Sequence, residues 1–157
     1  MMKQSPEMRA VSRLMAPGVV TRDGFLGHDR RRLEEILDAD RSTVVRLGTT
    51  HGEIAGALRA AFDAVRSQLG RPTDLGEGLQ GVYREAMGRI PCVWPGCGVF
   101  QKGEVELTDA RTGETLILTD LGIHLIARHG FYQGRGSRCR IEPEVACRLF
   151  GLGDRSA

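Results

Sequence analysis

Two cysteines followed at a distance by two histidines constrain the fold of this chain more than any other sequence feature. Cys92 and Cys97 open the stretch, and His124 and His129 close it. Thiolate sulfur and imidazole nitrogen are the ligands that zinc prefers in a tetrahedral site. Between the two pairs the sequence predicts a β-hairpin and then a helix, the order of elements in a ββα zinc unit. We therefore expect these four residues to bind one zinc ion.

The spacing of the four ligands sets conditions on this site. A Pro-Gly step inside Cys92-x4-Cys97 allows the chain to fold back, so that both sulfur atoms face one centre. The interval from Cys97 to His124 exceeds the gap of about 12 residues in a DNA-reading finger, and a longer hairpin would account for the excess. On an ideal helix, His124 and His129 point roughly 140° apart, so both can bind one ion only if the last turn is distorted.

Three other readings of these residues remain open. The cysteines and histidines are core residues without a metal in the first, because free cysteine is often buried and buried histidine is usually hydrogen-bonded. Cys139 is one of the zinc ligands in the second, whereas Cys147 fits the apolar face of a helix. The third is a zinc-dependent, hydrolase-type enzyme with an open coordination position. Its ligands are Cys92, Cys97 and His129, its acid or base is His124, and its nearest carboxylates in sequence are Glu104 and Asp120.

A basic, glycine-rich loop follows the second histidine. Guanidinium groups beside open backbone amides suit a phosphate or carboxylate group, so this loop is a candidate contact for nucleic acid or another anionic ligand. The alternative is a solvated loop with surface arginines. The candidate residues are Arg135, Ser137, Arg138 and Arg140.

Length and charge narrow the functional class. The chain has 157 residues and a formal net charge of +2, so it lacks the strong basic charge of a typical nucleic-acid-binding domain. At this length it can bury a core without metal, and zinc would stabilise one part of the fold. No signal peptide or membrane-spanning run is apparent, so we expect a cytoplasmic protein without a membrane partner. In that reducing compartment, cysteines are thiols or metal ligands.

The first part of the sequence predicts an arm and then a helical half. Residues 1–27 are expected to form a weakly ordered arm, in which any short helix stops at Pro17-Gly18. Residues 28–70 should form the helical half. Its apolar spacing predicts one helix from about Asp29 to Asp38 and a second short helix, capped by Asp40, before Gly48.

The next helix is predicted between Thr50 and Leu69. Thr50 and Glu53 form a capping box, and apolar residues then recur at helical spacing. Such a helix could also form a homodimer through its exposed face. His51, in its first turn, is expected to be a surface residue.

Residues 71–157 predict a mixed half that completes an α+β fold. A loop from Arg71 to Gly81 leads to an ambiguous segment that favours a strand. Alternating residues predict strands at 105–108 and 115–118, joined by a turn. Two short helices then complete a single compact domain of N-terminal helices and a small antiparallel sheet. The first runs from Leu121 to His129, and the second begins near Pro143.

The segment Thr119–Ser137, with the sequence TDLGIHLIARHGFYQGRGS, resembles a family of small uncharacterised bacterial proteins. The segments Gly24–Gly27 and Leu33–Leu37 are similar to that family too. The resemblance implies no activity. The residues themselves favour a binding or regulatory module with a structural zinc, and the alternatives are the zinc enzyme and a metal-free oligomerising protein.

Overall fold

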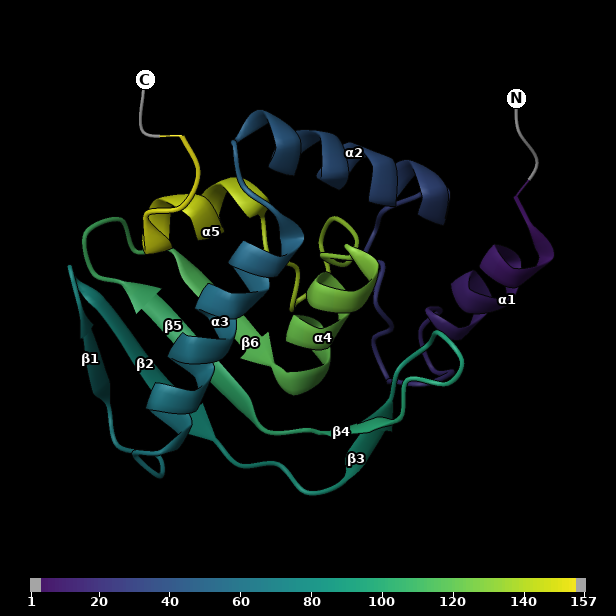
Figure 1. The fold of residues 1–157 in the computed structure, drawn as a ribbon. Helices are drawn as coiled ribbons and strands as arrows, with labels where there is room; N and C mark the ends of the chain where they lie inside the picture. Colours follow the sequence, from purple (N-terminus) through teal and green to yellow (C-terminus); the bar gives the residue numbers. More distant parts are fainter. Residues whose placement is uncertain (1–3, 155–157) are drawn as a thin grey trace.

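The centre of the fold is an antiparallel sheet of four strands (Figure 1). The computed structural model describes residues 4–154. The strand order of the sheet is β1-β2-β5-β6, and a separate two-stranded ribbon joins β3 to β4. These elements confirm the α+β class. The sheet strands are β1 (Thr73–Gly76), β2 (Leu79–Arg84), β5 (Glu104–Asp109) and β6 (Thr115–Thr119), and the ribbon strands are β3 (Arg89–Pro91) and β4 (Val99–Gln101).

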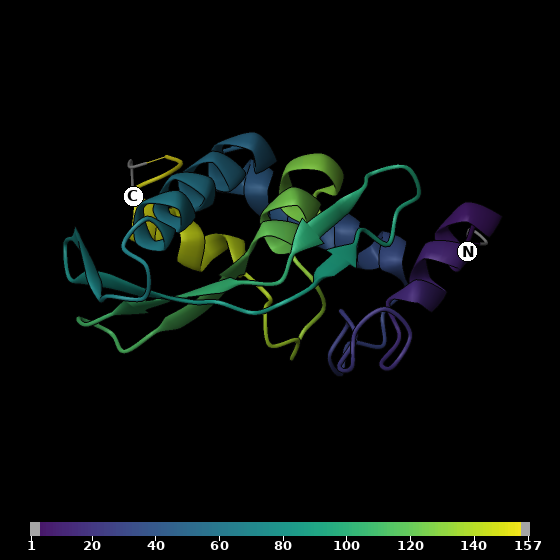
Figure 2. The same cartoon turned by 90° about the horizontal axis from the view of Figure 1, so that it is seen from below.

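Helices α3, α4 and α5 lie on one side of the sheet (Figure 2), and α2 packs beside α5 at one end. Among the described residues, no helix is long and apolar enough to cross a membrane. The helices are α1 (Pro6–Leu14), α2 (Leu33–Arg46), α3 (His51–Arg66), α4 (Asp120–His129) and α5 (Pro143–Phe150).

Helix α3 is the element that packs most directly on the sheet. The Thr50 hydroxyl accepts a hydrogen bond from the Glu53 amide at 3.0 Å, as the predicted N-cap requires. Gly81 in β2 permits a close approach, because a Cβ there would lie 2.6 Å from Val65 of α3. The resulting core contains Ile54, Leu58, Phe62, Val105, Leu107 and Leu118, all almost fully buried.

The segment 29–48 differs from the prediction of two short helices. It forms the single helix α2, because no glycine or proline interrupts residues 33–46. Asp40 is not a cap. It lies in the middle of α2 with a nearly buried side chain, and Arg140 from the far end of the chain neutralises it.

The expected weakly ordered arm is folded over most of its length. Helix α1 begins after Ser5, whose side chain accepts a hydrogen bond from the Met8 amide. Val11 and Met15 are buried in a second apolar cluster with Phe25. Their burial stabilises the segment through contacts from distant elements, which periodicity within a short stretch does not reveal. Residues 1–3 of the arm and residues 155–157 lie outside the described chain.

Part of the predicted loop 71–81 is a β-hairpin. Gly76 of β1 pairs with Leu79 of β2, so Glu77 and Gly78 form a two-residue turn. Both have positive φ, at 55° and 78°, as a type I′ turn requires. The sequence Glu-Gly is a weaker signal for this turn than Asn-Gly or Asp-Gly, which explains why the hairpin was not predicted.

The cysteine pair lies inside a hairpin, whereas the sequence predicted that the hairpin would follow it. Cys92 and Cys97 occupy the loop between β3 and β4, and the Cys92 amide donates to the Gly98 carbonyl at 3.2 Å. The predicted hairpin, β5–β6, belongs to the main sheet. It thus separates the ribbon from α4 in the chain and accounts for the long interval between the two ligand pairs.

Candidate metal centre

The four predicted ligands converge on one centre. The loop of the β3–β4 ribbon supplies Cys92 and Cys97, and α4 supplies His124 and His129. One ligand atom from each residue can be chosen so that all four lie within 4.8 Å of one another. The ribbon and α4 pack directly against each other through β4. The fold therefore joins two pairs that are far apart in the sequence.

The distances fit a tetrahedral zinc site. His129 Nε2 lies 3.6 Å from Cys92 Sγ and 3.4 Å from Cys97 Sγ. With ordinary Zn–S and Zn–N bond lengths, a tetrahedron separates sulfur from nitrogen by about 3.5 Å. Thiol hydrogen bonds to the imidazole would explain at most one of these contacts, because a neutral ring has a single acceptor nitrogen.

An observation on His124 favours a metal site over a cluster of hydrogen-bonded side chains. The Nε2 atom of this residue is buried and has no hydrogen-bond partner in the described protein. Buried polar atoms without a partner are rare and costly, and a missing ion is one of their ordinary explanations. The residues present therefore fit a soft divalent metal.

The expected distortion of α4 is not needed. The helix runs to His129 and ends at Gly130, whose φ of 62° is that of a left-handed cap. The imidazole rings of His124 and His129 nevertheless lie with their centroids 5.4 Å apart. A separation of roughly 140° around the axis therefore does not keep the two rings apart.

Aromatic rings shield both histidines. The Trp94 ring stacks on the His129 ring, with centroids 4.0 Å apart and planes inclined by 9°. Phe100 of β4 packs against His124 at 4.4 Å. The rings fix both imidazoles and limit the access of water, which stabilises a rigid site.

Burial controls the protonation of the ligands in the metal-free protein. It lowers the pKa of His129 to about 4, with smaller contributions from His124 and Arg128. It also lowers the pKa of His124, so both rings are neutral and able to coordinate at neutral pH. The same burial raises the pKa of Cys92 to about 11, so a cation is needed to convert this thiol to a thiolate.

The other candidates for this centre lie elsewhere. Among the described residues, the metal-binding group does not contain Cys139, which lines a cavity, or Cys147, which is core as predicted. The carboxylates considered for an enzyme are already paired. Glu104 bonds Arg138, and Asp120 accepts a hydrogen bond from Arg59 at 2.7 Å.

The basic loop does not present four free anion-binding groups. Arg138 forms a two-point ion pair with Glu104, at 2.7 and 2.5 Å. Arg140 is buried against Asp40, and the Ser137 hydroxyl donates to Gln133 at 2.6 Å. Only Arg135, whose backbone amide bonds Asp29, has a guanidinium group with no carboxylate partner in the described chain.

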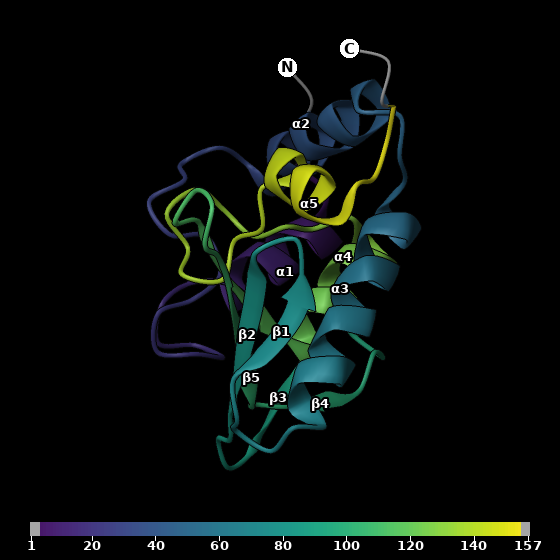
Figure 3. The ribbon, with the colours of Figure 1, turned by 90° about the vertical axis from the view of Figure 1, so that its left-hand side faces the viewer.

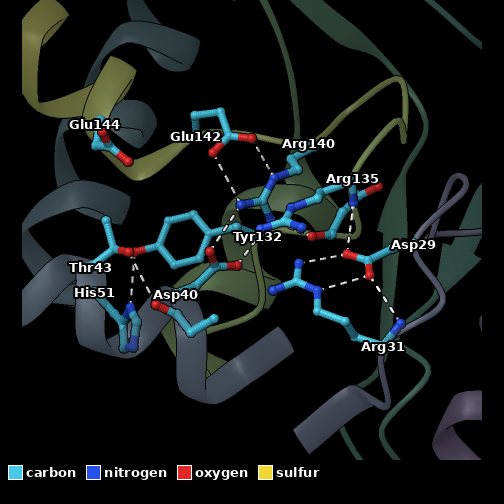
Figure 4. A network of polar contacts seen from close by, with 12 residues as sticks. Asp29, Arg31, Asp40, Thr43, His51, Tyr132, Arg135, Arg140, Glu142 and Glu144 are labelled. Carbon is cyan, nitrogen blue, oxygen red and sulfur yellow. Dashed lines mark hydrogen bonds and ion pairs between the residues drawn. The ribbon is translucent and has the colours of Figure 1, made fainter. Parts of the chain in front are cut away.

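A buried polar network that sequence reasoning missed surrounds Arg140 (Figure 4). Its guanidinium group bonds both oxygens of Asp40 at 2.9 Å and also contacts Glu142. Nearby, the hydroxyl of the fully buried Tyr132 lies 2.9 Å from His51 Nδ1. His51 is therefore not the free surface residue that was expected, and burial lowers its pKa. Only the separation of these partners in the chain hid the network.

The fold and this centre define an α+β protein with a Cys2His2 group that could hold a metal ion. No protein-family model matches the sequence, and neither a curated protein nor a solved structure matches it.

Proposed function

We propose that this chain is a zinc-binding protein of the cytosol, in which one structural ion is held by Cys92, Cys97, His124 and His129. The unpartnered, buried Nε2 atom of His124 carries the proposal, because three further zinc-type ligands surround it. The ion would fasten the β3–β4 ribbon to α4 and would make the protein a rigid binding module.

A structural role is favoured over a catalytic one. Four protein ligands complete a tetrahedron and leave no position for water or substrate. The described metal-binding group contains no carboxylate that could act as a general base. Trp94 and Phe100 also cover the two imidazoles. We propose that the module with this closed metal site acts by binding another molecule.

Metal analysis of the purified protein tests the site. We expect one zinc per chain, and Cys97→Ser or His124→Gln should reduce the bound zinc at least tenfold in competition with a chromogenic chelator. Cys139→Ser is the matched control, because this thiol lies outside the group, and it should retain full zinc. A purified protein that binds no zinc after reduction and reloading would overturn the proposal. Loss of zinc in Cys139→Ser alone would move the site to the alternative ligand.

A further inference from the structure

A second candidate site is a cavity at the end of β6, with Thr119 of that strand and Leu121 of α4 in its lining. Its volume is about 860 Å³. Such a volume is within the range of sites that enclose a small organic molecule. Its lining comes from distant parts of the chain, which include residues 20–27, residues 84–86, the β3–β4 ribbon with Lys102, the start of α4, and residues 133–139. Figure 3 shows the loop segments 20–27 and 133–139 away from α3, on the other side of the sheet.

Two of the loops that line the cavity pack closely against each other through their backbones. The backbones of Gly27 and Ser137 are so close that a Cβ on Gly27 would lie 2.3 Å from the Ser137 nitrogen. Gly134 contacts Leu26 in the same way, and its amide donates to the Phe25 carbonyl at 2.9 Å. Only glycine permits such an approach, so the two loops are locked together.

Gln133 is a polar residue in the lining of this cavity. It has a φ of 73°, which is rare and strained for a residue other than glycine, and only 5% of its surface is exposed. Arg140 holds its carbonyl at 2.6 Å, and the Ser137 hydroxyl donates to its Oε1 atom at 2.6 Å. Strain that the surrounding structure maintains in this way is found at binding sites.

These contacts leave one group of Gln133 without a partner. Its Oε1 atom is engaged, so the orientation of the amide is fixed, whereas Nε2 forms no hydrogen bond in the described protein. Nε2 lies near the first turn of α4, 3.9 Å from the position that a Cβ on Gly122 would take. Leu121 and Thr119 of the same turn line the cavity. The cavity lining therefore contains a donor on a nearly buried residue that has no acceptor in the described protein.

The charged and apolar groups that line the cavity indicate the chemical class of ligand that it would suit. The lining of the cavity contains three carboxylates and four cations. The cations are Arg22, Arg84, Lys102 and Arg138. Glu104 pairs with two of them, and Arg22 and Lys102 have no ion pair in the described chain. Val20, Phe25, Ile90 and Leu121 add an apolar surface. An excess of cations and a free amide donor suit an anion, and the apolar wall suits an organic body.

We propose that this cavity binds a small organic carboxylate, whose oxygen accepts a hydrogen bond from Gln133 Nε2. The apolar part of the ligand lies against Phe25 and Leu121, and Lys102 and Arg22 supply the countercharge. This names the ligand of the binding module proposed above. The Gln133 amide reports on it independently of zinc, so failure of one proposal can be distinguished from failure of the other.

Nuclear magnetic resonance of the zinc-loaded protein tests the cavity directly. Benzoate, phenylacetate and hexanoate serve as probes at millimolar concentration, and the side-chain amide signal of Gln133 is followed. We expect a saturable shift of this signal with at least one acid, and affinity at least tenfold weaker for the corresponding neutral amide. The absence of a saturable shift at Gln133 for all three acids would overturn the proposal.

Substitution at Gln133 gives the second test. Gln133→Glu replaces the donor with a carboxylate of the same shape and should weaken binding at least tenfold. Gln133→Gly removes the donor while it relieves the positive φ, so it keeps the proposal testable if the first variant does not fold. Gln80→Glu, the same change at an exposed position of β2, is the matched control and should bind as the wild type does. Undiminished affinity in both Gln133 variants would disprove the assignment.

Discussion

Some single residues join distant parts of this molecule through polar pairs. Arg140 is the clearest case, because its side chain is only 8% exposed and it bonds Asp40, Glu142 and the Gln133 carbonyl. Its ion pair with Asp40 joins the middle of α2 to the segment that precedes α5. Removal of one charge from a buried pair leaves the other without compensation.

Arg140→Met should therefore reduce the free energy of unfolding by about 3–5 kcal/mol. Urea denaturation followed by circular dichroism measures this change. Arg41→Met is the control, because the pair of Arg41 with Asp38 is about two-thirds exposed and should contribute no more than about 0.5 kcal/mol. A loss below about 1 kcal/mol in Arg140→Met would show that the network adds little.

Glu104 gives a prediction of pH dependence. Its hydrogen bonds to Arg138 hold its pKa below the ordinary value, despite partial burial. The folded protein therefore binds the proton less readily than the unfolded chain. The stabilisation is complete above the unfolded pKa of about 4.5 and is lost as the pH falls through the folded value.

Glu104→Gln should thus cost about 1 kcal/mol at neutral pH and much less in acid, because Arg138 is half exposed and solvent weakens the pair. Urea midpoints of the wild type and the variant, measured across the acidic range, check this. An equal difference at every pH would mean that the effect of the substitution is steric rather than electrostatic.

The elements of the fold differ in how far the sequence predicts them. The helices α3, α4 and α5 have their own caps and apolar spacing, and β5 and β6 alternate clearly, so they were predicted nearly to their ends. The short strands β1, β3 and β4 carry no such local signal, because each is defined by its hydrogen-bonded partner. The four residues of the candidate metal centre were predicted as a group from residue type and spacing, and the fold brings them together. The partners of Arg140 and His51 were not predicted, because tertiary contact alone brings them together.

The β1–β2 turn is an element whose sequence does not suit its conformation. Glu77 has a φ of 55°, a left-handed conformation that asparagine tolerates better than glutamate. Glu77→Asn should raise the free energy of unfolding by about 0.5 kcal/mol, measured from the urea midpoint. Glu77→Gln is the control, because it removes only the ion pair with Arg111. The two groups are 3.7 Å apart and largely exposed, so this variant should change the free energy of unfolding little. Destabilisation by the asparagine variant would contradict the assignment of the turn.

At the scale of the whole molecule, the two apolar clusters are formed by different secondary-structure elements. The first packs α3 and α5 on the sheet, whereas the second joins α1, the start of α2 and α4 to the cysteine loop. The proposed zinc contacts only the second cluster, which contains the buried thiol Cys92 and borders Trp94. Removal of the metal should therefore weaken the two clusters unequally.

Trp94 is the single tryptophan of the chain and reports on the second cluster. In the presence of a chelator, its fluorescence should change at a lower temperature than the circular dichroism of the sheet and helices, whereas the two transitions should coincide in zinc. His51→Gln, which changes the polar contact with Tyr132 near Arg140, should leave this difference between the two transition temperatures unchanged. Coincident transitions with and without chelator would show that the metal does not support the second cluster selectively.

The insertion of β5–β6 between the two ligand pairs has a consequence for how the protein matures. The cysteine loop and α4 are separated in the chain by β5 and β6 of the main sheet, so we expect the two ligand pairs to come together only when those strands have paired. The ion would thus join a nearly finished molecule, with little influence on how fast the sheet assembles. Its effect would instead fall on the rate of unfolding, which slows when a late contact must break first.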